Sequence, residues 1–323
     1  MELESIIAPI QGDLDAFEEE LSATLAVDSP LILGITEHLL GRRGKRMRPA
    51  LVFLSARAQG PLPESALRAS MAIELIHTAT LLHDDVVDES PTRRGQASVN
   101  AKWNNLISVL MGDYLFSKAF HLLVRVESPD LMQAVSAATE QVSLGELLEV
   151  QESHNFEIDE PGYLKIINAK TASLFAASCE AGAVLADSPE PVRHRLKSYG
   201  NEIGTAFQIS DDLLDLIGSQ EKTGKTAGND IKEGRVTLPM IHALQQAPDK
   251  QRRDILQLLD NGSSTKHFDE IRRFVVDHGG VDYARDRAMT LEARARRHLV
   301  DLPDSPYKDA LLELARFVVS REA

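Results

Sequence analysis

The sequence predicts an all-α protein, a bundle of about 12 or more helices. Apolar residues recur at three- and four-residue spacing through most of the 323 residues, which is the period of an amphipathic helix. No stretch alternates convincingly between apolar and polar residues, as a half-buried strand would. Glycine and proline punctuation is sparse, and no low-complexity tract or change in composition indicates a linker. We therefore expect a single all-α domain over residues 1–323.

Capping and turn residues separate the predicted helices. Ser128 stands before Pro129, and Asp159 stands two residues before Pro161, so an acceptor side chain precedes a proline suited to a first helical turn. Glycine and proline predict turns at 60–63, 260–262 and 304–306. The segments with helical spacing are, in chain order, 5–27, 30–41, 48–59, 64–89, 104–126, 129–152, 160–186, 189–217, 236–246, 250–260, 268–278, 280–300 and 305–321.

Two of these segments, residues 69–87 and 172–185, are apolar nearly all round. A helix without a polar face belongs inside a bundle, with other helices packed about it. Acidic clusters lie at or near the ends of the central helices, which suggests a central apolar cavity with carboxylates at its mouth. An ordinary filled core is the alternative, and the periodicity is compatible with both.

Composition excludes several classes of protein. The formal charge of −14 argues against a nucleic-acid binder, which needs a basic surface. A single cysteine, Cys179, rules out an intrachain disulfide and a thiolate zinc site. The N-terminus lacks the basic and apolar regions of a signal peptide, and there is no run of eighteen apolar residues. We expect a soluble, cytoplasmic protein.

The sequence contains two acidic pentads, Asp84 to Asp88 and Asp211 to Asp215, 127 positions apart. In a helix, the first and last Asp of each pentad lie one turn apart on the same face. Pro91 should end the first helix near Ser90, so its carboxylates meet the negative end of the helix dipole, at a cost of about 0.3–1 kcal/mol each. A hard divalent cation, Mg²⁺ above all, would remove this cost. One pentad alone could be a solvated helix face, but two argue for a metal site.

Basic residues flank both pentads and stand out in an acidic chain. Arg and Lys together suit a diphosphate, because Arg gives bidentate contacts and Lys a mobile charge. Each cluster alone could be solvated loop charge, but their position beside the pentads predicts anion binding. The clusters are Lys45, Arg46 and Arg48; Arg93 and Arg94; and Lys222, Lys225, Lys232 and Arg235.

The chain resembles the trans-isoprenyl diphosphate synthases, or polyprenyl synthetases, over nearly its whole length. It is most similar to the octaprenyl type between His77 and Arg94. One departure is Arg235, where the family usually has Lys. The motifs that carry the resemblance are residues 44–49, 76–89, 93–95, 170–171 and 207–208, the second pentad and residues 234–239.

The resemblance implies the helical fold of isoprenoid synthases, a homodimer, several Mg²⁺ ions and two substrate sites. The metal ligands would be Asp84, Asp88, Asp211, Asp212 and Asp215. An allylic diphosphate would bind between the pentads with Arg93, Lys170, Thr171, Gln208 and Lys225 around it, and Arg235 would be a further substrate-binding residue. Isopentenyl diphosphate would bind through Lys45, Arg48, His77 and Arg94, although His77 alone could be a core histidine paired with Glu74. The catalytic residues would be Asp84, Asp85, Asp88, Lys170, Gln208, Asp211 and Lys225.

The implied reaction is ionisation of the allylic diphosphate, condensation with isopentenyl diphosphate and loss of a proton. Metal and cationic side chains would stabilise the departing diphosphate. A short-chain geranylgeranyl diphosphate synthase is one alternative. A class I terpene cyclase is another, but its second metal site usually mixes Asn, Ser or Thr with Glu, and aromatic residues are only 5% here. A non-catalytic partner subunit should have lost a pentad or the basic loops, and this chain has both.

Small residues upstream of the first pentad predict a long product. Ala79 and Thr80 stand where a Phe or Tyr would close the cavity early, and one helical turn of 5.4 Å spans about one isoprene unit. We expect a product of about thirty-five to forty-five carbons made from farnesyl or geranylgeranyl diphosphate, with Ile76, Ile73 and Val135 at the floor. Release of so apolar a product suggests weak membrane association.

Overall fold

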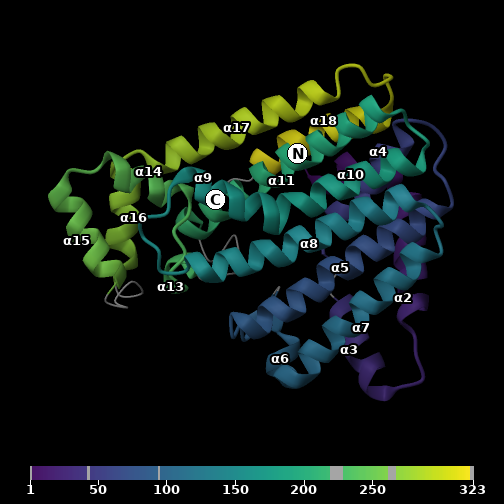
Figure 1. Ribbon diagram of the computed structural model, residues 1–323, viewed down its shortest axis with the longest axis horizontal. Coiled ribbons are helices and arrows are strands. Elements are labelled where there is room, and N and C mark those ends of the chain that lie inside the picture. The colour runs from purple at the N-terminus through teal and green to yellow at the C-terminus, as the bar shows by residue number, and fades with distance from the viewer. Residues whose placement is uncertain (1, 42–43, 94, 219–227, 261–266, 321–323) are drawn as a thin grey trace. The chain divides into compact units, whose positions relative to one another are not determined.

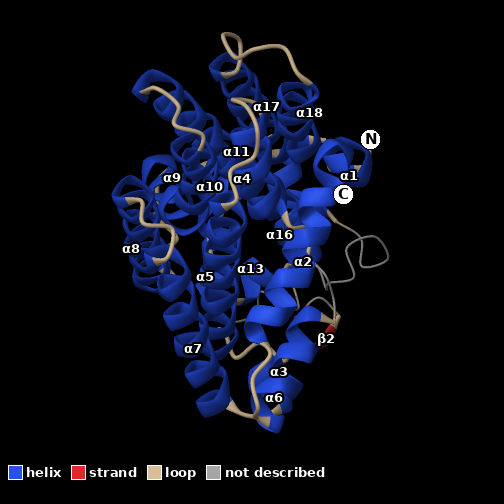
Figure 2. Ribbon diagram, turned by 90° about the vertical axis from the view of Figure 1, so that its right-hand side faces the viewer, coloured by secondary structure: helices blue, strands red, loops and turns tan. Residues whose placement is uncertain are grey.

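The computed structural model describes residues 2–41, 44–93, 95–218, 228–260 and 267–320 (Figure 1). The described residues are almost all helical, as Figure 2 shows, and the all-α prediction is confirmed. The chain divides into two compact units. Unit 1 comprises Met1–Thr139, Leu174–Gly200 and Leu299–Leu314, and unit 2 comprises Glu140–Ser173, Asn201–His298 and Ala315–Ala323. That the whole chain is one domain stays a prediction.

The central helix of unit 1 is α5, which carries the first pentad. It packs against α2, α4, α6 and, most extensively, α7. Residues 69–76 of α5 are buried without interruption, as predicted for a helix inside the bundle. The elements of this unit are α1 (Leu3–Ile7), a 3₁₀ turn (Ala8–Ile10), α2 (Gln11–Leu25), α3 (Pro30–Leu40), α4 (Met47–Arg57), α5 (Ser65–Val87), β1 (Thr92–Arg93), β2 (Gln96–Ala97), α6 (Val99–Lys102), α7 (Asn105–Val124), and most of α10 (Ser173–Leu185).

The second predicted inner helix, α10, is also buried nearly all round. It lies against α4 at Gly182, where an added Cβ would be 2.4 Å from the carbonyl oxygen of Val52. Only glycine allows the two backbones to approach this closely. The single cysteine, Cys179, is buried in the same helix, and burial raises the pKa of its thiol to about 12. Cys179 is therefore a small core residue.

Unit 2 is organised around α14, which packs against α9, α16 and α17. Among the described residues, α8 (Pro129–Glu152), α11 (Glu190–Ile217) and α18 (Pro306–Val319) cross a unit boundary, and α10 does so by its first residue, Ser173. The other elements of unit 2 are α9 (Glu160–Ile167), a π-helical turn (Asn168–Ala172), α13 (Asn229–Lys232), α14 (Leu238–Gln246), α15 (Asp249–Asp260), α16 (Phe268–Asp277) and α17 (Gly280–His298).

The structure differs from the predicted elements in a few places. Thr92–Arg93 and Gln96–Ala97 form a small antiparallel hairpin. Each strand has only two residues, too few to show an alternating pattern in the sequence. The predicted helix over 160–186 is interrupted by the π-helical turn, and the predicted helix over 5–27 by a 3₁₀ turn at Pro9. The short helices α6 and α13 were missed, because four residues give no period to detect.

Candidate active site

The first pentad ends α5 in a Schellman motif, confirming the predicted helix end before Pro91. Ser90 N donates to the Asp85 carbonyl at 2.9 Å, and Glu89 N donates to the Val86 carbonyl at 3.3 Å. Glu89 has φ 48°, the left-handed conformation that this motif requires at C′, the residue after the C-cap Asp88. Asp84 and Asp88 therefore stand in the last turn, where their charges oppose the helix dipole.

Asp85 has a different environment from Asp84 and Asp88, which are half-buried. Its side chain is only 2% exposed, and one carboxylate oxygen accepts from Arg93 Nε at 2.6 Å. Arg93 reaches it because the β1–β2 hairpin returns toward the end of α5, where Asn100 Nδ2 also donates to the Asp85 carbonyl at 2.9 Å. Asp85 thus anchors Arg93, a predicted diphosphate ligand, while Arg94 lies outside the described residues.

Three predicted ligands of isopentenyl diphosphate also belong to unit 1. Lys45 is exposed and precedes α4, and His77 is half-buried on α5. Arg48 stands in the first turn of α4 with its guanidinium 4.9 Å from the ring centroid of Phe175, a cation–π contact. Glu74 was a possible partner for His77, but it pairs with Arg46 at 2.7 Å.

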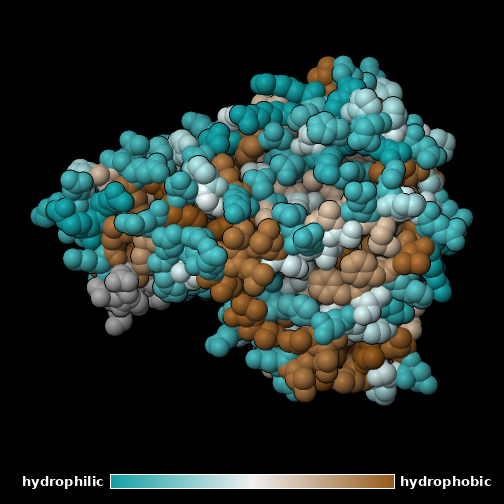
Figure 3. Space-filling view, in the orientation of Figure 1, coloured by the Kyte–Doolittle hydropathy of each residue, from teal (hydrophilic) through white to brown (hydrophobic). Residues whose placement is uncertain are grey.

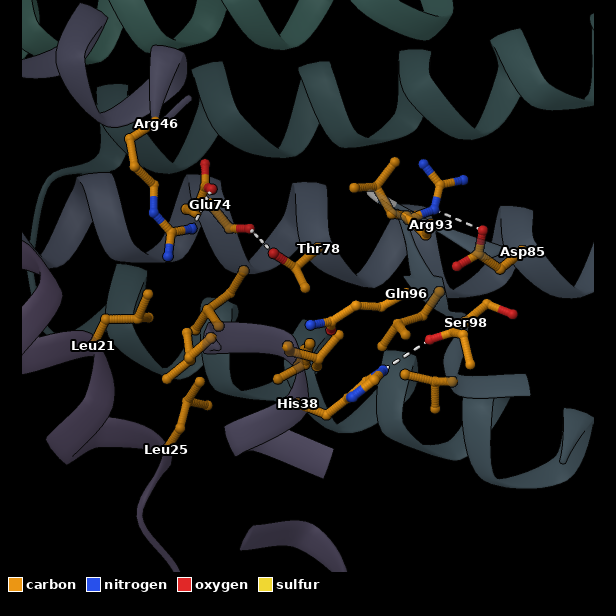
Figure 4. Close-up of a pocket in the computed structure, with 18 residues that line it drawn as sticks. Leu21, Leu25, His38, Arg46, Glu74, Thr78, Asp85, Arg93, Gln96 and Ser98 are labelled. Atoms are coloured by element: carbon orange, nitrogen blue, oxygen red, sulfur yellow. Dashed lines mark hydrogen bonds and ion pairs between the residues drawn. The ribbon is translucent and has the colours of Figure 1, made fainter. Parts of the chain in front are cut away.

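A cavity of about 80 Å³ lies beside α5 in unit 1 (Figure 4). The α5 residues that line it recur at helical spacing: Glu74, Leu75, Thr78, Leu81, Leu82 and Asp85. Of the predicted chain-length residues, Ala79 and Ile76 are fully buried and Thr80 is half-buried, and none of the three lines this cavity. α5 therefore presents two stripes, one with Glu74, Thr78 and Asp85 and one with His77, Asp84 and Asp88.

The second pentad lies in the last two turns of α11, and its middle carboxylate, Asp212, is again the buried one. Tyr163 Oη donates to Asp212 Oδ2 at 2.6 Å, and Gln208 Nε2 donates to Oδ1 at 2.8 Å. Burial raises the pKa of Asp212 to about 7, repulsion from Asp211 adds to this, and the two hydrogen bonds oppose it. Thr171 Oγ1 donates to Gln208 Oε1 at 2.8 Å, so the Gln208 amide bridges Thr171 and Asp212.

Asp215 caps the short helix α13. Its two carboxylate oxygens accept from the backbone amides of Asn229 at 3.1 Å and Asp230 at 3.0 Å. These hydrogen bonds hold the start of α13 against the end of α11. The predicted ligand Lys225 belongs to residues 219–227, which lie outside the described residues. Burial raises the pKa of Asp230, and nearby Asp212 and Asp215 raise it further, while Arg235 lowers it. Asp211 is exposed.

Lys170 and Arg235 form ion pairs with acidic residues of α8 and the segment after α13. Lys170 Nζ lies 2.8 Å from Glu146 and 2.5 Å from Glu149, and Arg235 lies 3.3 Å from Glu149 and 2.8 Å from Glu233. Glu149 therefore connects both cations. Asp230, at 3.8 Å, is the third carboxylate around Arg235. The planar guanidinium of Arg offers several N–H donors to these three groups, which the single ammonium of a Lys would not.

The π-helical turn brings the Lys170 backbone against Gly145 of α8. A Cβ at residue 145 would lie 2.4 Å from Lys170 N and 2.7 Å from its Cα. Single π turns within α-helices are frequent at functional sites. Here the turn places Lys170 and Thr171 on a cavity of about 110 Å³ that Gln208, Asp212, Asp230 and Arg235 also line.

The donor set fits a hard divalent cation. All the predicted metal ligands are carboxylates, which is the oxygen chemistry that Mg²⁺ prefers. Within the described ranges, no three acidic, histidine or cysteine side chains converge as a complete metal site. An ion would therefore take its remaining ligands from water and substrate oxygens, as Mg²⁺ usually does when it binds phosphates.

Sequence reasoning missed several residues of the site. Tyr163 gave no signal, since it is 49 residues from its partner Asp212. Glu146 and Glu149 are spaced i, i+3 on one helix face, which could have indicated a partner for Lys170. Asp230 and the Arg46–Glu74 pair were also not predicted.

Comparison with known proteins identifies the family. Residues 29–275 match the family model described as "Polyprenyl synthetase". An all-trans-nonaprenyl-diphosphate synthase (geranyl-diphosphate specific) of Rhodobacter capsulatus is 38% identical over 319 residues, 98% of each chain. An octaprenyl diphosphate synthase of Haemophilus influenzae is 35% identical over 321 residues, 99% of this chain and 98% of that protein.

A solved structure supports the same assignment. The polyprenyl synthase of Caulobacter crescentus CB15, complexed with calcium and isoprenyl diphosphate, has a TM-score of 0.95 and 35% identity, and the match covers 100% of this chain and 98% of that one. The predicted resemblance is thus confirmed over the whole length. The chain belongs to the polyprenyl synthetase family and is a prenyltransferase.

Proposed function

We propose that the protein is a chain-elongating trans-prenyltransferase that condenses isopentenyl diphosphate with an allylic diphosphate and releases diphosphate. The observation that supports this proposal most is that the two pentads have the same structural arrangement. Each ends a long helix, buries its second Asp against neutral or cationic donors, and keeps its other carboxylates half-buried or exposed. The relatives named as nonaprenyl and octaprenyl diphosphate synthases favour this activity.

The residues of the chain would have distinct roles in this reaction. Asp84, Asp88, Asp211, Asp212 and Asp215 would hold Mg²⁺, which when bound neutralises charge on the leaving diphosphate. Arg93 would turn from Asp85, and Lys170 from Glu146 and Glu149, toward the diphosphate, since ion pairs already hold each of them beside the pentad of its own unit. Lys45, Arg48 and His77 would orient isopentenyl diphosphate. Apolar walls would exclude the water that traps an allylic cation.

The product is proposed to be a long polyprenyl chain of about thirty-five to forty-five carbons. Ala79 has no bulk with which to close a cavity, and Thr80 has little. The proposed starters are farnesyl and geranylgeranyl diphosphate.

We also propose a cytoplasmic homodimer. The surface of α7 supports this, because Leu106 and Leu110 are 66% and 54% exposed one turn apart. Figure 3 shows apolar surface at the lower edge of the view, where Figure 1 draws α6 and α7. Among the described residues, α7 is also the helix long and apolar enough to cross a membrane, but its opposite face is buried against α5. Weak membrane association during product release completes the proposal.

One assay tests the activity. Purified protein is incubated with farnesyl diphosphate, isopentenyl diphosphate and Mg²⁺, and the products are identified by mass spectrometry. Elongated prenyl diphosphates are expected, with lengths that also separate long-chain from geranylgeranyl synthesis. Cyclic hydrocarbons would indicate a terpene cyclase instead, and absence of any product would exclude a self-sufficient synthase.

A further inference from the structure

Three charged side chains are clustered in unit 1, Glu74 buried and Arg46 and Glu18 largely so, and the proposed reaction uses none of them. Arg46 Nε lies 2.7 Å from Glu18 of α2, and Arg46 Nη1 lies 2.7 Å from Glu74 of α5. The side chains of Arg46, Glu18 and Glu74 are 10%, 15% and 5% exposed. Figure 4 shows Arg46 and Glu74 at one end of the cavity, and Arg93 and Asp85 at the other. We call this group the Arg46 triad.

Stability alone is a poor explanation for the Arg46 triad. Burying two carboxylates and a guanidinium costs desolvation energy that an apolar cluster of similar size would not. Burial lowers the pKa of Arg46, but Glu74 and Glu18 outweigh it and hold that pKa above its usual value, so the group stays charged. The backbone of Arg46 is also left-handed, with φ 49°, which is unfavourable for a residue other than glycine. Such costs concentrate where a local geometry serves function.

The Arg46 triad fixes the segment that carries two proposed diphosphate ligands. Arg46 is the N-cap of α4, and its carbonyl accepts from Ala50 N at 3.0 Å. Lys45 precedes it directly and Arg48 follows by two residues, so the backbone angles of Arg46 set the direction from one to the other. Because the guanidinium holds both α2 and α5, this N-terminus has little freedom to move.

The same contacts connect that segment to a third proposed ligand. Glu74 and His77 are three residues apart on α5, about one helical turn. The Arg46–Glu74 ion pair therefore ties the Lys45 and Arg48 segment to the helix that carries His77. One buried contact couples the positions of all three side chains.

We propose that Arg46 is a positioning residue for the isopentenyl diphosphate site, with Glu18 and Glu74 as its anchors. This inference rests on the proposed function, since it assumes that Lys45, Arg48 and His77 bind that substrate. Loss of the triad should weaken binding of isopentenyl diphosphate more than binding of the allylic diphosphate, whose proposed side-chain ligands Arg93, Lys170 and Gln208 lie outside the segment that Arg46 holds.

The chain offers a matched control at the other end of α4. Arg57 of α4 pairs with Asp13 of α2 at 2.7 Å, with side chains 30% and 15% exposed. Arg57 thus links the same two helices as Arg46 and Glu18 but is far along α4 from Lys45 and Arg48. The comparison of Arg46→Gln with Arg57→Gln separates positioning from simple stabilisation.

Steady-state kinetics with each substrate varied in turn provides the test. Arg46→Gln is expected to raise KM for isopentenyl diphosphate about tenfold or more, because small displacements of binding groups have large effects, and to leave KM for the allylic substrate within about twofold. Arg46→Lys keeps the charge and one anchor, so its KM should fall between those of Arg46→Gln and the unchanged protein. Arg57→Gln should change neither KM, even if it lowers Tm.

The possible outcomes have separate meanings. If the unchanged protein makes no elongated product, the proposed function fails and the inference loses its basis. If it is active but Arg46→Gln leaves KM for isopentenyl diphosphate unchanged, or raises both KM values equally, the positioning role is overturned. Circular dichroism checks folding. Should Arg46→Gln not fold, the isosteric Glu74→Gln is judged by the same two criteria.

Discussion

At the residue scale, the two pentads use equivalent aspartates differently. Asp85 is paired with Arg93, whereas Asp212 has two neutral donors, Tyr163 and Gln208. The buried carboxylate of each pentad therefore organises neighbouring side chains, while Asp84, Asp88 and Asp211 are more accessible to a cation. This division could not be read from the sequence, in which both pentads have the same pattern.

Removing one accessible carboxylate from either pentad should abolish turnover. We expect Asp84→Ala and Asp211→Ala each to lower kcat at least about a hundredfold to a thousandfold, because charge on the leaving diphosphate would lose its stabilisation. Helix content by circular dichroism should not change. Asp113→Ala removes a carboxylate that is 64% exposed in unit 1 and should leave turnover near normal. Substantial activity in Asp84→Ala or Asp211→Ala would contradict the metal assignment.

His242 gives a pH dependence that is separate from the site residues. Its ring stacks on Tyr283 with centroids 4.0 Å apart, and burial lowers its pKa below the ordinary value of 6.5. The unfolded chain therefore binds a proton at His242 more readily than the folded protein does. The stability of the folded state is thus highest above about pH 6.5 with respect to this group, and it decreases as the pH falls below that value. His242→Phe keeps the stacking without the titration. Its Tm should fall less between about pH 7.5 and about pH 5.5 than that of the unchanged protein, and an equal fall would refute the assignment.

At the element scale, periodicity predicted the long helices well and local irregularities poorly. Residues 69–76 of α5 are buried on every side, as their apolar sequence indicated. The π-helical turn at Lys170 has no such signature in the sequence. It depends on Gly145 of α8, 25 residues earlier, where the absence of a side chain lets the Lys170 backbone come close. The hairpin that brings Arg93 to Asp85 has only two residues in each strand. These features position the site, and each depends on contacts distant in sequence.

Because α5 presents two stripes, substitutions on each stripe can show, through the length of the product, along which stripe the prenyl chain grows. Thr80→Tyr, at a half-buried position one turn before Asp84, should shorten the product if growth follows the stripe below Asp84. Ala79→Tyr should also shorten it, but Ala79 is fully buried and lies off that stripe, so a tyrosine there strains the core more. Thr78→Tyr fills the cavity beside α5 instead and should leave the product length unchanged. The measurement is mass spectrometry of the polyprenyl diphosphates. Shortening by Thr78→Tyr alone would move the growing chain to that cavity.

At the scale of the whole molecule, the sequence predicted the fold class and the family, and the structure adds a surface that the sequence did not indicate. Exposed Leu106, Val109 and Leu110 form an apolar strip on α7, which helical periodicity alone would assign to the core. The division of the chain into two units was also not predicted, because helices α8, α11 and α18 pass a boundary without any break in sequence pattern.

The apolar strip on α7 predicts the effect of a charge at its centre. Leu110→Glu would place a carboxylate in the proposed dimer interface, where it would be desolvated, and should yield a monomer by size-exclusion chromatography with light scattering. Val300→Glu is the control, since Val300 is 68% exposed in the turn after α17, and this variant should stay dimeric. A dimeric Leu110→Glu would place the interface elsewhere.

The spacing along α5 also limits how such a chain can change in length. Glu74 and Asp85 are eleven residues apart, close to three full turns, and each holds an arginine of a different loop. Inserting or deleting one residue between them would rotate one carboxylate by about 100° relative to the other and detach one of the two loops. This stretch of α5 must therefore keep its residue count for both arginine pairs to form.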